Sequence, residues 1–201
     1  NSVVLNAADA TGSSTQSFNI VVNGIPTFSS SPTLTTDEDS VYTYNITVSD
    51  PEGDTTTITA PTVPGWLSLT DNNDNTATIT GTPLQANVGD NSVTIRSTDS
   101  SGGYKEQSFT IAVANVNDAP SFTSTAVTTV DEDSTYTYNI TVSDEDGETA
   151  TITAPTLPAW LTFTDNGNNT ATLSGTPSDS NIGSNSVVLN AADATGSSTQ
   201  S

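Results

Sequence analysis

The sequence contains no cysteine, no histidine and no methionine, and only two basic residues among its 201 positions. Without cysteine it can form no disulfide bond, and without cysteine and histidine it lacks thiol nucleophiles, Ser–His pairs and the usual ligands of zinc. The two basic residues stand against 23 acidic ones, which gives a formal net charge of −21. Nucleic acids and anionic membranes bind basic surfaces, so this charge argues against both as partners.

No long apolar run indicates a membrane-spanning segment and no signal peptide is recognisable, so we expect no direct membrane insertion. High acidity with 32% hydrophobic residues is compatible with disorder. The apolar residues nevertheless alternate, as in Tyr42, Tyr44, Ile46 and Val48, which is typical of a strand with one buried face. No stretch has a helical period, and Thr, Val, Ile and Tyr favour strands. The sequence therefore predicts an all-β protein.

Internal repeats organise the chain. The segment DEDSVYTYNITVSD at 37–50 recurs as DEDSTYTYNITVSD at 131–144, with one difference in fourteen positions. The first seventeen residues, Asn1–Ser17, recur without change as Asn185–Ser201. Such repetition indicates tandem copies of one structural module, and we expect a parent with a longer array of them.

The repeat pattern predicts three parts. Residues 1–24 hold the last two strands of a partial module, 25–119 form a complete module, and 120–201 form a module that lacks its last strand. In the complete module, turn residues separate seven short runs of strand-forming residues. The expected strands are 27–35, 41–49, 55–60, 66–70, 76–81, 91–98 and 104–114. This spacing predicts Greek-key β-sandwiches repeated as a linear array.

Trp66 opens one of these strands, and its position favours a role in the core of the sandwich. An exposed aromatic platform for a sugar is the alternative. If successive strands are antiparallel, the loops after the second, fourth and sixth strands lie at the N-terminal end of each module. The other loops lie at its C-terminal end.

The acidic residues sort by these two ends. At the N-terminal ends they are Asp50, Glu52, Asp54 and Asp99 in one module, Asp144, Asp146, Glu148 and Asp193 in the next, with Asp9 as the counterpart in the partial module. Glu38 and Asp39 lie at the C-terminal end of the complete module, and Asn115, Asn117 and Asp118 lie in the linker that follows it. In a linear array these groups converge, and carboxylates that converge repel one another unless a cation lies between them. Calcium takes six to eight such oxygens, so the pattern predicts Ca²⁺ as the cofactor. The alternative is that the acidic loops are solvated and only aid solubility.

The motifs YTYNITVSDEDGE, PAWL, LSGTP and LNAADATG, with NVNDAP between modules, resemble cadherin-like repeats along essentially the whole chain. The most similar group is the dystroglycan-type cadherin-like (CADG) group, which occurs in extender regions of large bacterial adhesins, including RTX-type ones. The resemblance implies calcium at the junctions, bound by Glu38, Asn115, Asn117 (through its backbone oxygen), Asp118, Asp144, Asp146 and Asp193. Asn115 stands where cadherins usually carry Asp, and their Asp-Arg-Glu stretch has no counterpart here. We therefore expect one or two ions at each junction instead of three.

The function that follows is mechanical. Calcium-rigidified spacers at the surface of a cell would hold a binding tip away from it, with neighbouring repeats of the same chain as their partners. A module that binds a sugar or another module through its own surface is the alternative. It needs exposed aromatic or apolar patches, and only 6% of residues are aromatic. Paired carboxylates can also cleave glycosides, but acids that recur at module ends favour a chain that is not an enzyme.

The partial modules suggest a further partner. Phe18, Ile20 and Val22 alternate like the last strand that 120–201 lacks. We expect that this segment of one chain can complete the module of another, by head-to-tail strand donation.

Overall fold

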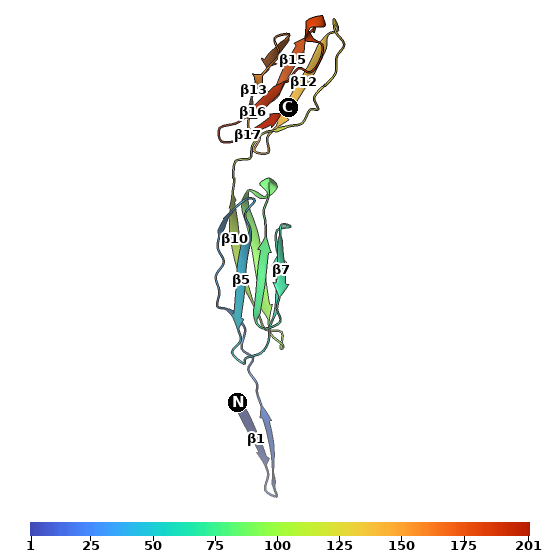
Figure 1. The fold of residues 1–201 in the computed structure, drawn as a ribbon. Helices are drawn as coiled ribbons and strands as arrows, with labels where there is room; N and C mark the ends of the chain where they lie inside the picture. The colour runs from blue at the N-terminus through green and yellow to red at the C-terminus, as the bar shows by residue number, and fades with distance from the viewer. The chain divides into compact units, whose positions relative to one another are not determined.

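The computed structural model describes all residues from Asn1 to Ser201 and divides into two compact units, 1–115 and 116–201. Apart from two short 3-10 turns at Gln85–Asn87 and Asp179–Asn181, its regular structure consists of β-strands (Figure 1). The prediction of an all-β protein is confirmed. The predicted division after residues 24 and 119 stays a prediction.

Unit 1 contains a sandwich of two four-stranded sheets. The first sheet has the order β3 (Thr27–Phe28), β5 (Tyr42–Ser49), β8 (Thr76–Gly81) and β7 (Leu67–Asp71). The second has the order β4 (Thr35–Asp37), β10 (Tyr104–Ala114), β9 (Gly89–Thr98) and β6 (Thr57–Thr62). Strands that are distant in sequence are neighbours in each sheet, as a Greek-key sandwich requires.

The core lies between the two sheets. The alternating residues of β5 point into it, and Ile46 is fully buried. Ile79 of β8, Ile95 of β9 and Ile111 of β10 are buried as completely. Burial of each such side chain stabilises the fold by about 1.5–3 kcal/mol relative to exposure. The period-two pattern in the sequence is therefore the pattern of the core.

One predicted strand was wrong. The expected strand 27–35 is divided into β3 and β4, which belong to different sheets. Pro32 lies between them and cannot donate to a strand ladder. The hydroxyl oxygen of Ser30 instead accepts a hydrogen bond from the backbone N–H of Thr47, at 2.9 Å. The chain therefore changes sheets here, and β4 pairs in parallel with the end of β10.

Trp66 packs against the core, as predicted. Its ring meets Tyr42 edge to face, with 6.1 Å between ring centroids, and its indole N–H donates to Asn91 Oδ1 at 2.9 Å. Gly81 of the Gly-Thr-Pro motif passes directly over it, and a Cβ at that position would lie 1.9 Å from the Trp66 carbonyl oxygen. Gly175 has the same relation to Trp160, at 2.1 Å. This close approach explains why both copies of the motif begin with glycine.

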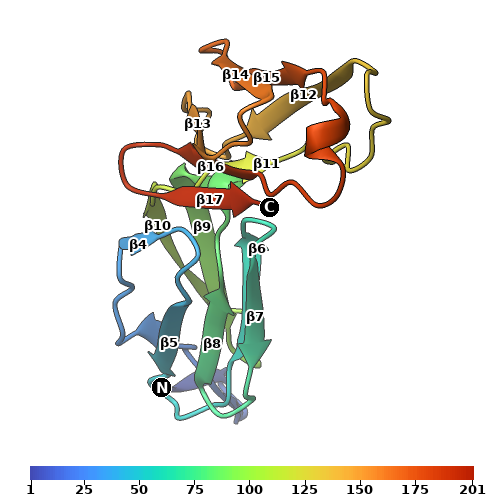
Figure 2. The same ribbon diagram turned by 45° about the horizontal axis from the view of Figure 1, so that its top comes forward.

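Unit 2 repeats this architecture with a smaller second sheet. Its first sheet has the order β11 (Ser121–Phe122), β12 (Tyr136–Ser143), β15 (Thr170–Gly175) and β14 (Leu161–Asp165). The second has the order β13 (Thr151–Thr156), β16 (Val188–Ala192) and β17 (Ser197–Gln200) (Figure 2). β17 corresponds to the first part of β10.

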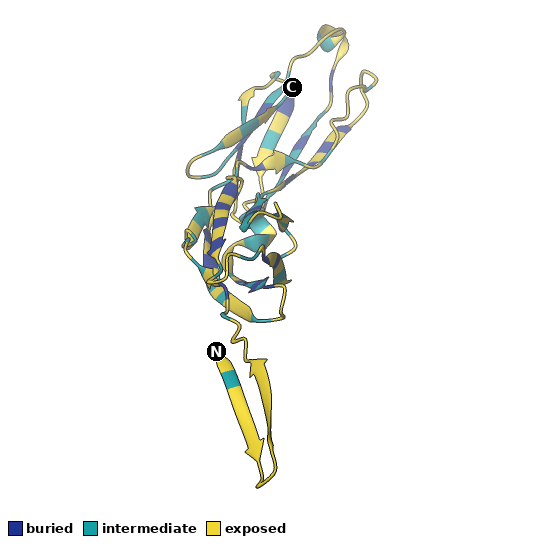
Figure 3. Cartoon of the chain, turned by 90° about the horizontal axis from the view of Figure 1, so that it is seen from below, coloured by how far each residue is buried: buried dark blue, intermediate teal, exposed yellow.

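The first residues form a hairpin of β1 (Ser2–Ala8) and β2 (Ser13–Asn19), which pair antiparallel. Nearly all of its residues are exposed (Figure 3). Large apolar side chains at its end and just beyond it are exposed too, among them Phe18, Ile20 and Val22. No helix in the structure has the length and apolar character needed to cross a membrane.

Candidate metal centre

The N-terminal end of unit 2 is built around Asp144, which directly follows β12. One oxygen of its carboxylate, Oδ1, accepts hydrogen bonds from the backbone N–H groups of Asp146 and Glu148, at 3.0 and 3.2 Å. These bonds close the loop and involve only one of the two carboxylate oxygens. The other oxygen, Oδ2, is buried and has no hydrogen-bond partner. A buried carboxylate oxygen in that state is costly unless a cation or a donor reaches it.

The linker ahead of unit 2 is tied to two loops at this end. The side-chain amide of Asn117 donates to Asp193 Oδ2 at 3.0 Å, and the backbone N–H of Asp118 donates to Asp146 Oδ2 at 2.7 Å. Asp193 also accepts from the backbone N–H groups of Thr195 and Gly196 through Oδ1. The bond from Gly196, and after it those from Asn117 and Thr195, hold the pKa of Asp193 below its ordinary value. Asp193 therefore connects the linker to the loop that it closes.

The same network recurs in unit 1. Asp50 Oδ1 accepts the backbone N–H groups of Glu52 and Asp54, at 3.0 and 3.2 Å, while its buried Oδ2 has no hydrogen-bond partner. The amide of Asn23 donates to Asp99 Oδ2 at 2.9 Å. This bond, the largest cause, lowers the pKa of Asp99. The prediction that these loops and the linkers lie at one end of each module is confirmed.

The two linkers differ at the next position. Gly24 donates its backbone N–H to the carboxylate of Glu52 at 3.1 and 3.2 Å, as Asp118 does to Asp146. Gly24 brings no carboxylate of its own, and a Cβ there would lie 2.8 Å from Glu52 Oε2. The backbone geometry is thus shared, and the longer linker adds one acidic side chain.

Other predicted ligands lie elsewhere. Glu38 is buried, with 1% of its surface exposed, and its backbone N–H donates to the Ala114 carbonyl at 3.0 Å. Asp39 has a left-handed backbone (φ 57°), and Asn115 is an exposed residue of unit 1. Their predicted convergence with residues of unit 2 stays a prediction.

Asp9 lies in the hairpin loop, in the position that Asp99 has in unit 1. Its Oδ1 accepts from the backbone N–H and hydroxyl of Thr11 and from the backbone N–H of Gly12. The hydroxyl bond is the largest cause of its lowered pKa. The acidic turn therefore forms here without the rest of a module, and its role as a ligand stays a prediction.

The structure contains no group of three or more acidic side chains placed to hold a metal ion. It brings acidic residues to the linkers in pairs, with amide and backbone groups between them. All the available donors are oxygens, which is the ligand chemistry of calcium and not that of zinc or copper.

Two asparagines that support the acidic loops were missed from the sequence. Asn75 accepts the backbone N–H of Thr56 at 2.7 Å and donates to the Asp54 carbonyl at 3.1 Å. Asn169 makes the equivalent bonds to Ala150 and Glu148, at 2.7 and 3.1 Å. Both have positive φ, 68° and 61°, which asparagine tolerates better than most residues. Their recurrence in two copies of the Asn-Thr-Ala-Thr motif was the available signal.

Fold and site together define an immunoglobulin-like β-sandwich repeat with acidic linker ends. The chain belongs to the family described as "Putative Ig domain", whose profile matches residues 25–114 and 119–201.

Among curated relatives, a "Serine-rich adhesin for platelets" of Staphylococcus aureus (strain MRSA252) is 33% identical over 160 residues. The match covers 77% of this chain but only 11% of that protein. Among solved structures, extracellular cadherin domains 1–5 of protocadherin gamma B2 match with a TM-score of 0.54 at 18% identity, over 100% of this chain and 44% of that one. This likeness concerns the fold alone. An endo-fucoidan hydrolase of glycoside hydrolase family 107 matches at 28% identity with a TM-score of 0.44, over 99% of this chain and 33% of that one.

Proposed function

We propose that this chain is a stretch of spacer repeats from a large cell-surface adhesin, stiffened by calcium ions bound at the linkers. The nearly identical tandem modules suit a spacer, whose length matters more than any one of its surfaces. Membership of an Ig-like repeat family and the similarity to a bacterial adhesin support this assignment. We further propose that the repeats belong to the dystroglycan-type cadherin-like group found in RTX-type adhesins, with a role in adhesion and biofilms outside the cell; the motifs described above support this proposal.

The main support for the calcium assignment is a pair of buried carboxylate oxygens that have no hydrogen-bond partner, which are called the orphaned oxygens below. Asp50 Oδ2 and Asp144 Oδ2 are equivalent atoms in two units, and both are buried without a hydrogen-bond partner. The other oxygen of each carboxylate is held by two backbone donors, so the free oxygen is fixed in direction. A solvated acidic loop has no need of such an arrangement, whereas a cation site does.

The remaining donors fit the same ion. In unit 2 the ligands would be Asp144, Asp146, Asp193 and Asp118, with an oxygen of Asn117. In unit 1 they would be Asp50, Glu52, Asp54 and Asp99, with backbone oxygens of the linker. Glu38, Asp39 and Asn115 of the preceding module would be further ligands of the proposed unit 2 site. When bound, the ion supplies the positive charge that allows these carboxylates to lie together.

A surface that binds sugars or other modules directly is the alternative. Such a surface needs exposed aromatic side chains, and the exposed ones here are Phe18 and Tyr104. The Arg96 guanidinium lies over the Tyr104 ring, 4.5 Å from its centroid. We assign no catalytic role to the chain, because the paired carboxylates hold linkers instead of lining a cleft.

Calcium titration by calorimetry tests the proposal. We expect binding with a Kd of about 10⁻⁴–10⁻³ M, as in other extracellular modules. Asp144→Asn should remove the heat of the unit 2 site and Asp50→Asn that of the unit 1 site. Asp90→Asn, which makes the same charge change at an exposed position of β9, is the control and should bind as the parent does. Equal titrations for all four proteins would contradict the calcium assignment.

A further inference from the structure

The first linker contains an asparagine followed by glycine, which is a chemically labile pair. Asparagine loses its side-chain amide when the backbone nitrogen of the next residue attacks the side-chain carbonyl carbon. A following glycine leaves that nitrogen unhindered, because glycine has no Cβ. The pair occurs twice in the chain, at Asn23–Gly24 in the linker and at Asn166–Gly167 in the turn between β14 and β15.

The structure distinguishes these two sites by the direction of the amide. Asn23 Nδ2 donates to the carbonyl of Gly24 at 2.7 Å and to Asp99 Oδ2 at 2.9 Å. The Asn23 side chain therefore lies along the peptide whose nitrogen must attack it. Asn166 Nδ2 instead donates to the hydroxyl of Thr170 at 3.0 Å, on the other side of the turn. Only the linker site of these two thus has its reacting groups brought together.

The attacking nitrogens have similar partners at both sites. Gly24 donates its N–H to the carboxylate of Glu52 at 3.1 and 3.2 Å, and Gly167 donates its N–H to Asp165 Oδ1 at 3.0 Å. Each carboxylate is within reach of the hydrogen that the nitrogen gives up when it attacks. The difference between the sites therefore lies in the asparagine side chain and not in the partner of the glycine nitrogen.

The second linker has the same amide contacts with a different following residue. Asn117 Nδ2 donates to the carbonyl of Asp118 and to Asp193 Oδ2, both at 3.0 Å. Since this orientation forms in both linkers, it is a property of the linker and its acidic loop. Asp118, unlike glycine, has a Cβ and a charged side chain beside its nitrogen. Asn117 is therefore oriented as Asn23 is, but its neighbour is a poorer nucleophile.

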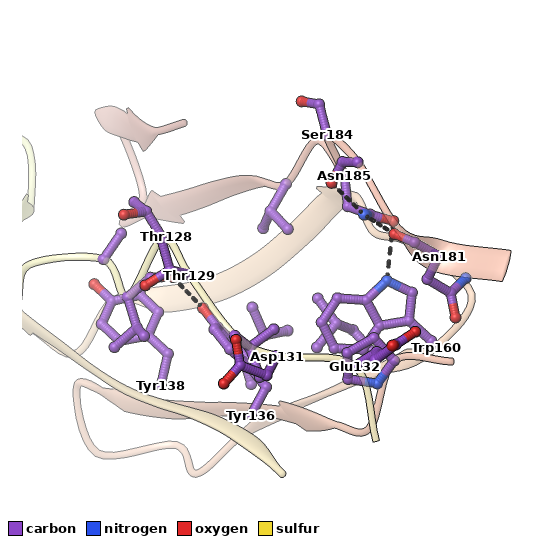
Figure 4. A pocket seen from close by; sticks show the side chains of 18 of the residues that line it. Thr128, Thr129, Asp131, Glu132, Tyr136, Tyr138, Trp160, Asn181, Ser184 and Asn185 are labelled. Carbon is purple, nitrogen blue, oxygen red and sulfur yellow. Dashed lines mark hydrogen bonds between the residues drawn. The ribbon is translucent and has the colours of Figure 1, made fainter. Parts of the chain in front are cut away.

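Asn185 shows how the fold holds an asparagine in another way. It precedes the small residue Ser186, but its side chain accepts the indole N–H of Trp160 at 3.0 Å (Figure 4). Its amide donates to the backbone carbonyls of Asn181 and Gly183, at 2.8 and 3.1 Å. All three partners precede Asn185 in the chain, and they hold its amide instead of the peptide that follows it.

We propose that Asn23 is a site of spontaneous deamidation, and that this modification releases the first linker from unit 1. The Gly24 nitrogen forms a bond to Asn23 Cγ and gives up its proton, while the Cγ–Nδ2 bond breaks and Nδ2 leaves with a proton as ammonia. Water reaches the exposed Asn23 and opens the cyclic imide at either carbonyl. Opening at Cγ breaks the new bond and gives aspartate. Opening at the main-chain carbonyl breaks the original peptide bond and gives isoaspartate, whose main chain passes through Cβ.

The modification changes the contacts between the linker and the acidic loops. In both products a carboxylate replaces the amide that donated to Asp99 Oδ2, so a hydrogen bond becomes a contact between like charges. Isoaspartate also lengthens the main chain ahead of Gly24, whose N–H is bound to Glu52. The first linker would therefore loosen as the protein ages, whereas the second linker would keep its amide.

Peptide mapping by mass spectrometry tests the site. The full chain is kept at physiological temperature in mildly alkaline buffer with a chelator, so that the result does not depend on the calcium proposal. We expect Asn23 to deamidate at least about tenfold faster than Asn166 or Asn117, because orientation of the reacting groups accelerates the attack. In concentrated urea the fold positions neither side chain, and Asn23 and Asn166 should react at similar rates. A rate ratio of Asn23 to Asn166 that is no greater in the folded chain than in urea would overturn the proposal.

Hydrogen exchange tests the effect on the linker. Asn23→Asp reproduces the aspartate product, and we expect the Gly24 amide hydrogen to exchange at least about tenfold faster than in the parent. Slow exchange along β5 shows that unit 1 of the variant is folded. Asn166→Asp makes the same charge change in the turn of unit 2 and should leave exchange at Gly24 as it is in the parent. Equal exchange at Gly24 in the parent and in Asn23→Asp would contradict release of the linker.

Discussion

Units 1 and 2 have the same sequence in β5 and β12, the same contact between a tryptophan and a glycine, and equivalent acidic loops. They differ at one edge of the sandwich. In unit 1, Glu38 is buried and residues Thr35–Asp37 form the strand β4. In unit 2, the equivalent Glu132 is exposed and residues 129–131 are not a strand. Residues 116–201 include no counterpart of the second half of β10. In unit 1 this half-strand both contributes Ile111 and Val113 to the core and pairs with β4.

The largest expected effect follows from this difference. We expect units 1 and 2, each of which has its own core, to unfold in separate transitions. Ile111 is fully buried, so Ile111→Ala should cost unit 1 about 2–5 kcal/mol and leave the transition of unit 2 in place.

Each unit contains one of the two tryptophans, Trp66 or Trp160. Fluorescence of Trp66→Phe and Trp160→Phe variants in urea therefore reports on the units one at a time. One shared transition for both tryptophans would contradict this prediction.

The linkers provide the second comparison. At a calcium concentration about 100 times Kd, a site stabilises the folded unit by about 2.7 kcal/mol. We expect a larger stabilisation of unit 2, whose linker carries Asp118, than of unit 1, whose linker carries Gly24. Asp118→Gly should reduce the unit 2 effect to that of unit 1, as measured by the shift of each tryptophan's transition. If Asp118→Gly leaves the calcium response of unit 2 unchanged, the linker acid is not a ligand.

A third comparison concerns two carboxyl groups. The amide of Asn23 is the main cause that lowers the pKa of Asp99, whereas that of Asn117 comes second to the Gly196 backbone for Asp193. Asn23→Ala should therefore raise the pKa of Asp99 more than Asn117→Ala raises that of Asp193, as followed by carboxyl NMR. A depressed pKa in the folded state stabilises above the unfolded value, here near 3.8, and this contribution is lost as pH falls through the folded pKa. The stability that each amide contributes should thus be fully present above about pH 4 and be lost as the pH falls below it.

The smallest effect is expected on the surface. Arg96 and Glu106 form an ion pair at 2.6 Å in unit 1, with about 40% of each side chain exposed, and unit 2 has Asn190 in place of the arginine. Exposed pairs of this kind contribute about 0–1 kcal/mol. Arg96→Asn should therefore move the unit 1 transition by less than 1 kcal/mol, even at low salt. A larger loss would show that the Arg96 guanidinium stabilises unit 1 more through its contact with the Tyr104 ring than through its ion pair with Glu106.

The sequence allowed much of the fold to be predicted, because alternation in Tyr42–Val48 and the exact repeats translate directly into strands and modules. It did not reveal the split of the first strand, since the effect of Pro32 depends on which sheet each half can join. The acidic loops were assigned to the correct end of each module by strand counting alone. The hydrogen bonds of Asn23 and Asn117 to those loops, and the orphaned oxygens of Asp50 and Asp144, depend on side-chain directions that no spacing encodes.

The parallel pairing of β4 with β10 bears on how the protein responds to tension. When a chain is pulled from its two ends, β4 is drawn from its beginning and β10 from its end. These two parallel strands then slide along each other, so the contacts from Thr35–Ala112 to Asp37–Ala114 carry the load together instead of opening one after another. Resistance to force depends on the rate of unfolding and not on equilibrium stability. Loss of this three-residue patch would therefore weaken a tether far more under pull than a melting curve would indicate.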